Sequence, residues 1–63
     1  MKTAKHLDKY VGKQVRLNLP EHELHGASGE SFAAEEKSGI AFVYVDIHDH
    51  ILLVRASNLL FEN

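Results

Sequence analysis

Apolar residues alternate along residues 40–47, and this is the strongest periodic pattern in the chain. The residues on its uniformly apolar face are Ala41, Val43, Val45 and Ile47. After a short polar break, the segment "ILLVRASNLLF" opens with a second alternating run, formed by Leu52, Val54 and Ala56. Alternation with a period of two is typical of half-buried β-strands. Two such runs this close in sequence predict an antiparallel hairpin.

The turn of this hairpin is constrained because both apolar faces must lie on the same side of the sheet. A two-residue loop at 48–49 meets this condition and places Val45 opposite Leu52. A four-residue loop at 48–51 meets it as well, whereas a three-residue loop would put Arg55 among apolar residues. In both favoured registers the first histidine of the His-Asp-His sequence lies in the turn.

The N-terminal residues predict a short helix. Thr3 is suited to the N-cap position, and Leu7, Tyr10 and Val11 fall on one helical face. Gly12 follows, where a glycine in the left-handed conformation would end the helix. A helix this short is unstable alone, so we expect its apolar face to pack on the rest of the domain.

A second strand is predicted immediately after this helix. Val15, Leu17 and Leu19 alternate with polar residues, and Pro20 ends the pattern or marks an edge position.

The segment 21–39 allows two assignments, because three glycines interrupt it and its periodicity is weak. Ser31 could cap a helical turn over residues 32–37. Alternatively, "SFAAEE" forms a strand that bends at Ser38 and Gly39. In both cases we expect Phe32, the one large apolar residue there, to fold back onto the core.

Together these elements predict a mainly β fold, a small strongly bent antiparallel sheet or barrel with a short N-terminal helix. The 63 residues form a single domain, 1–63. A domain of this size buries only about 60% of its unfolded surface. Because the chain has no cysteine, any additional stabilisation must come from a metal held by histidine and carboxylate groups or from self-association.

The order of elements resembles the Sm/Hfq-like RNA-binding fold. The helix that ends in glycine, the strand containing "VRL", and "AFVYVDIHDHILLV" with its aspartate near the turn carry this resemblance. The Src-homology-3-type barrels are similar in outline. Val15, Arg16, Leu17 and Asp46 match by residue type, whereas the second, C-terminal RNA-binding signature of the Sm/Hfq-like family is not visible. The resemblance implies a small bent β-barrel and offers RNA as a ligand.

Charge is unevenly distributed along the chain, although the net charge is only −2. Residues 1–16 have a balance of +4, and residues 17–36 have a balance of −5. The cations that would contact RNA phosphates are Lys2, Lys5, Lys9, Lys13 and Arg16. An acidic chain is an unusual nucleic-acid binder, so net charge disfavours this function.

Hydropathy predicts a cytoplasmic protein without membrane association. No apolar run approaches the roughly 20 residues of a membrane span. The sequence "MKTAKHLDKY" has no apolar centre of the signal-peptide type.

The histidines raise a metal-binding hypothesis, because imidazole and carboxylate groups suit zinc, copper or nickel. The candidate ligands are His22, His25, His48, Asp49 and His50. "HELH" is one residue short of the zinc-protease pattern, however.

The segment "GASGES" also lacks the lysine of a phosphate-binding loop and the spacing of a nucleophile elbow. We therefore expect no enzymatic activity, no cofactor, no metal and no small-molecule substrate.

The outer face of the hairpin is unexpectedly apolar for a surface exposed to solvent. Its residues are Ile40, Phe42, Tyr44, Ile51 and Leu53. Either the N-terminal helix covers them, or they form a protein interface. We favour a small non-enzymatic protein-interaction module, acting as a homo-oligomer or as an accessory subunit. The alternatives are an RNA-binding small barrel and a protein that binds metal through histidine and carboxylate groups.

Overall fold

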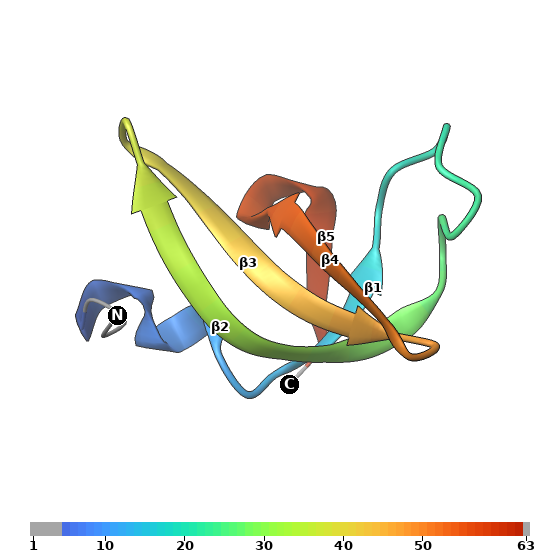
Figure 1. Ribbon diagram of the computed structural model, residues 1–63, viewed down its shortest axis with the longest axis horizontal. Helices are drawn as coiled ribbons and strands as arrows, with labels where there is room; N and C mark the ends of the chain where they lie inside the picture. The colour runs from blue at the N-terminus through green and yellow to red at the C-terminus, as the bar shows by residue number, and fades with distance from the viewer. Residues whose placement is uncertain (1–4, 63) are drawn as a thin grey trace.

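A computed structural model describes residues 5–62 and shows one bent antiparallel sheet (Figure 1). In chain order its elements are the 3₁₀-helix η1 (Lys5–Tyr10), the strands β1 (Gln14–Leu17), β2 (Ser28–Lys37), β3 (Ile40–Ile47) and β4 (His50–Arg55), the 3₁₀-turn η2 (Ala56–Asn58) and the strand β5 (Leu59–Glu62). The predicted mainly β fold with a short N-terminal helix is confirmed. The proposed N-cap, Thr3, lies outside the described residues.

The five strands are arranged in the order β4-β3-β2-β1-β5, so β4 and β5 form the two edges. Figure 1 shows that β2 and β3 are long, curved strands lying side by side. The beginning of β2 also pairs with β1, where Gln14 lies opposite Glu30. Because β2 has partners on both sides, it joins the β1–β5 half of the sheet to the β3–β4 half.

Both hairpins of the β2–β4 sheet turn through two residues with positive φ. Ser38 and Gly39 have φ of 53° and 79°, and His48 and Asp49 have φ of 52° and 67°. These values are typical of type I′ turns, whose twist matches that of the flanking strands. Val45 lies opposite Leu52, which confirms the two-residue register and places the first histidine in the turn.

The segment that allowed two assignments forms the strand, and one expectation about it is wrong. Phe32 does not fold back onto the core but is 48% exposed. Ser31 lies opposite Val45 and Ala33 lies opposite Tyr44, so the register shifts at Phe32. The additional residue of such a β-bulge changes the direction of the side chains, and Phe32 therefore faces outward.

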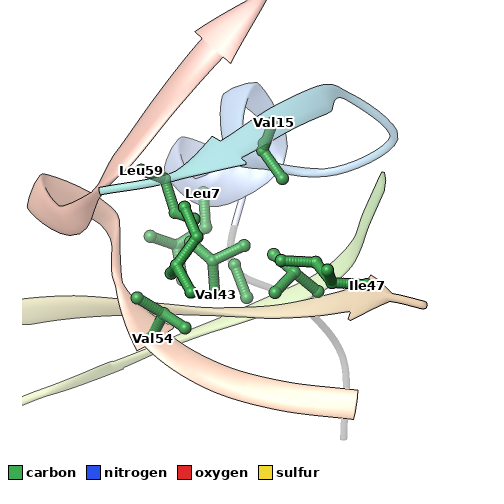
Figure 2. Close-up of a cluster of buried hydrophobic side chains, with 9 residues drawn as sticks. Leu7, Val15, Val43, Ile47, Val54 and Leu59 are labelled. Atoms are coloured by element: carbon green, nitrogen blue, oxygen red, sulfur yellow. The ribbon is translucent and has the colours of Figure 1, made fainter. Parts of the chain in front are cut away.

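The core lies between the two halves of the bent sheet. Its buried apolar residues, among those described, are Leu7, Val15, Leu17, Ala34, Val43, Val45, Ile47, Val54 and Leu59. In Figure 2, Val15 and Leu59 point toward Val43 from the opposite side of the core, and Leu7 lies among them. The predicted apolar faces of β1 and of the β3–β4 hairpin are thus confirmed as inner faces.

The connection from η1 to β1 is fixed by backbone contacts with β2. Gly12 has a φ of 74°, as predicted for the residue that ends the helix. Its N–H donates to the carbonyl of Ser31 at 2.9 Å, and the N–H of Ser31 donates to the carbonyl of Lys13 at 2.9 Å. The N–H of Lys13 donates to Ser31 Oγ at 3.0 Å. Ser31 therefore connects three consecutive elements.

The end of the chain forms a turn and a fifth strand that the sequence pattern did not predict. The strand β4 ends at Arg55, and η2 reverses the chain direction before β5. Leu59 then lies opposite Leu17 of β1. Ala56, predicted to continue the apolar face of β4, is instead the first residue of η2.

Candidate functional site

Apolar side chains gather on the outer face of β2, β3 and β4. This outer aromatic face consists of Phe32, Ile40, Phe42, Tyr44, Ile51 and Leu53. The exposed fraction is 66% for Ile51, 49% for Leu53 and 48% for Phe32. Phe42 and Tyr44 are half-buried, and Ile40 is exposed. The structure thus places all five residues of the predicted interface on one surface.

Phe32 joins this surface although the sequence did not indicate it. Its ring centroid lies 6.1 Å from that of Tyr44, a distance typical of packed aromatic pairs. Tyr44 in turn lies opposite Leu53 on β4. The apolar surface is therefore continuous across three strands. The sequence did not indicate the outward position of Phe32, because a β-bulge has no clear signature in the sequence of one strand.

The N-terminal helix does not cover the outer aromatic face. Leu7 is 3% exposed and belongs to the inner core. Tyr10 packs on Phe61 of β5, with ring centroids 5.6 Å apart. His6 Nε2 lies 3.0 Å from Glu36 Oε1, at the end of β2. Within residues 5–62, the first explanation for the apolar face, coverage by the helix, is therefore wrong.

Charged residues lie at both ends of the apolar surface. Asp46 lies opposite Ile51, and Arg55 lies opposite Phe42. On β2, Glu30 lies opposite Asp46. Asp46 and Arg55 are exposed, and neither forms an ion pair with another described residue. The face thus has an acidic corner near the hairpin turn and a basic corner at the end of β4.

Two of the basic residues proposed to contact RNA make contacts within the domain. Arg16 Nε donates to Glu62 Oε2 at 3.1 Å, and its terminal nitrogen donates to the carbonyl of Gly26 at 3.0 Å. Lys9 Nζ lies 5.2 Å from the centroid of the Tyr10 ring. Lys13 is half-buried, Lys5 belongs to η1, and Lys2 lies outside the described residues. The guanidinium of Arg16 is therefore already engaged with other groups.

The candidate metal ligands do not form a cluster in the part of the chain that is described. Within residues 5–62, no group of three or more histidine and carboxylate side chains is positioned to hold one ion. His22 Nδ1 instead accepts a hydrogen bond from the backbone N–H of Leu24 at 3.0 Å. His48 and Asp49 form the exposed turn of the β3–β4 hairpin.

One open depression lies in the loop between β1 and β2. It has a volume of about 520 Å³ and is lined by Leu19, Pro20, Glu21 and His22. The loop backbone closes through the N–H of His22, which donates to the carbonyl of Leu19 at 2.8 Å. The depression is separate from the residues of the outer aromatic face.

No protein-family model matches the chain, and no curated protein or solved structure matches it.

Among residues 5–62, no helix combines the length and apolar character that crossing a membrane requires.

Proposed function

We propose that the protein is a small non-enzymatic interaction module that binds protein through its outer aromatic face. The observation that carries this proposal is the continuous exposed apolar surface from Phe32 through Tyr44 to Leu53. Contiguous apolar surface on a soluble domain usually marks a binding site. The side chains on this face offer apolar area and aromatic rings, which are the groups that dominate protein interfaces.

The arrangement of the fold supports this proposal. The bend of β2 brings β1 and β5 over the inner face of β3, so the inner apolar residues are buried within one chain. The outer residues of the hairpin, in contrast, are not buried in this core. A face that folding leaves exposed is available to a partner.

The resemblance to Sm/Hfq-like and Src-homology-3-type small barrels is retained as part of the proposal. It is supported by a short helix, four consecutive antiparallel strands, a 3₁₀-turn and a fifth strand that returns to β1. This likeness concerns the architecture, whereas the proposed ligand follows from the outer aromatic face.

The proposal is tested by comparing capture of binding proteins by wild type and by the variants Tyr44→Glu and Asn18→Glu. Each variant adds one acidic group, but Asn18 is an exposed residue that follows β1 next to Asn58, at the end of β1 far from Phe32. We expect a protein that is identified by mass spectrometry to be retained by wild type and Asn18→Glu and lost with Tyr44→Glu. Equal retention by all three would contradict the proposal, provided that their melting curves show the same fold.

A further inference from the structure

Within residues 5–62, β4 is an edge strand, and it exposes backbone hydrogen-bonding groups next to the outer aromatic face. In a hairpin with a two-residue turn, the residues flanking the turn form a hydrogen-bonded pair, here Ile47 and His50. Such pairs alternate along antiparallel strands, so Leu52 and Val54 also direct their N–H and C=O groups toward β3. The groups of Ile51, Leu53 and Arg55 therefore point away from β3, at the edge of the sheet.

The strand β4 lacks the features that usually prevent edge pairing. Proline, lysine and bulges are the common protective devices on an edge strand. The β4 sequence "HILLVR" contains none of these residues, and its pairing with β3 is regular over all six residues. The opposite edge, β5, has only four residues, and Glu62 there is held by Arg16. The β4 edge is thus the better site for an added strand.

We propose that the occupant of this edge is a second copy of the chain, paired antiparallel through β4 about a twofold axis at Leu53. The proposal rests on the proposed function, because Ile51 and Leu53 of the outer aromatic face lie at this contact, whereas Phe32 remains accessible to a different protein. In this register Leu53 pairs with Leu53 of the second copy, and Ile51 pairs with Arg55 of the second copy. All three are residues whose backbone groups point outward, so each pair can exchange both of its hydrogen bonds.

Charge complementarity supports a second copy over an unrelated strand. Asp46 lies next to Ile51 on the outer face, and Ile51 would lie next to Arg55 of the second copy. Neighbouring strands are about 4.8 Å apart, so the long Arg55 side chain can cross Ile51 toward Asp46. The twofold axis repeats this contact, which gives each dimer two pairs. Asp46 and Arg55 lack ion-pair partners among the described residues of a single copy.

The same register extends the apolar surface across the interface. Tyr44 and Leu53 of one copy continue into Leu53 and Tyr44 of the other, in one row across four strands. Isologous contacts of this kind are the commonest form of assembly. An edge of six residues contributes less area than a standard interface of about 800 Å² per partner. We therefore expect a dissociation constant on the order of 10–100 µM.

The test is amide hydrogen exchange by NMR on the full chain, at about 10 µM and about 1 mM. The proposal predicts that the amides of Ile51, Leu53 and Arg55 gain roughly four- to sevenfold protection at the higher concentration, because they donate to the second copy. The amides of Leu52 and Val54 already donate to β3, so they serve as internal controls and remain protected at both concentrations. Exchange at Ile51, Leu53 and Arg55 that is independent of concentration would overturn the proposal.

Charge reversal provides a second test that does not depend on the exchange data. Asp46→Arg and Arg55→Asp should each weaken the dimer about tenfold in sedimentation equilibrium, because each places like charges together twice. The double variant should recover to within about threefold of wild type. Asp46 and Arg55 are well separated within one β3–β4 hairpin, so recovery would report contact between copies. A double variant no stronger than the single ones would overturn the register.

Phe32→Glu separates this inference from the proposed function. Phe32 lies on β2, two strands from the β4 edge, so the substitution should leave the dimer unchanged while it disrupts the outer aromatic face. A protein that stays monomeric at 1 mM but loses an identified partner with Phe32→Glu would overturn the dimer alone. A dimer that is lost with Phe32→Glu and shows no protection at the β4 edge would overturn edge pairing in favour of face-to-face contact.

Discussion

At the scale of single residues, Ser31 combines burial with polarity. Its side chain is 1% exposed, and its Oγ accepts the N–H of Lys13 at 3.0 Å. From the sequence, Ser31 was expected either to cap a helical turn or to begin a strand, and neither assignment indicated that its side chain is buried. Its role depends on β1, which is distant in sequence, and therefore could not be predicted from local pattern.

Replacing Ser31 with alanine should lower the free energy of unfolding by about 1–3 kcal/mol. The substitution leaves the part-buried N–H of Lys13 without its acceptor, and it also removes a hydroxyl that is itself buried. Urea denaturation with a shared slope measures the difference. Ser57→Ala, at an exposed position of η2, is the matched control. Equal midpoints for the two variants would show that this contact does not stabilise the fold.

Gly29 is required by the close approach of β2 and β3. A Cβ atom built on Gly29 would lie 2.5 Å from Ile47 Cγ1 and would also collide with the carbonyl oxygen of Asp46. Gly29 also lies opposite Val15 on β1, so it is located where β2 is shared by the two halves of the sheet. The sequence marked this glycine only as an interruption.

The substitution Gly29→Ala should destabilise the protein by about 1–3 kcal/mol, which is typical of added volume that the neighbouring backbone must accommodate. The neighbouring exposed residue provides the control Ser28→Ala, which should change the midpoint by less than about 0.5 kcal/mol. Thermal unfolding of both variants tests the prediction. A stability of Gly29→Ala equal to that of Ser28→Ala would mean that β2 and β3 are farther apart than described.

At the scale of elements, the central hairpin was the most predictable part of the chain. The alternation of Val43, Val45 and Ile47 fixed both the strand and the face that it buries. The requirement for a common inner face with Leu52 then limited the turn to two registers. The bulge at Phe32 and the pairing of β5 with β1 depend on contacts between distant segments, so a local period could not reveal them.

Substitution by glycine should change stability in opposite directions at two aspartates, Asp49 in the β3–β4 turn and Asp46 in β3. Asp49 has a φ of 67°, a region in which glycine is favoured over other residues. Asp49→Gly should therefore raise stability by about 0.5–1 kcal/mol. The same exchange at Asp46, inside β3, should lower it by a similar amount because glycine weakens a strand. Urea midpoints that shift in the same direction for both variants would contradict the turn assignment.

At the scale of the whole molecule, residues 5–62 bury the inner apolar side chains but leave the outer aromatic face exposed. The five interface residues predicted from the sequence do lie on this face, since they share the outer side of one hairpin. Coverage by η1 could not be decided from the sequence, because the apolar stripe of a short helix fits either face. The burial of Leu7 in the inner core decides it for the described chain.

The charge distribution predicts that single-stranded RNA is not a ligand. The net charge is −2, and Arg16 is held by Glu62 and by the carbonyl of Gly26. We expect no saturable retention of RNA in filter binding at low salt. Retention whose logarithm falls with the logarithm of salt concentration, at about −0.7 per phosphate contact, would contradict this expectation and favour the RNA-binding small barrel.

The central claim is that the outer aromatic face contacts protein, and site-specific photocrosslinking tests it most directly. A photoreactive phenylalanine analogue is placed at Phe32 in one sample and at Asn18, an exposed residue at the far end of β1, in another. The account predicts a discrete protein adduct, identified by mass spectrometry, from position 32 and none from position 18. Adducts of equal yield from both positions, or none from position 32, would contradict it.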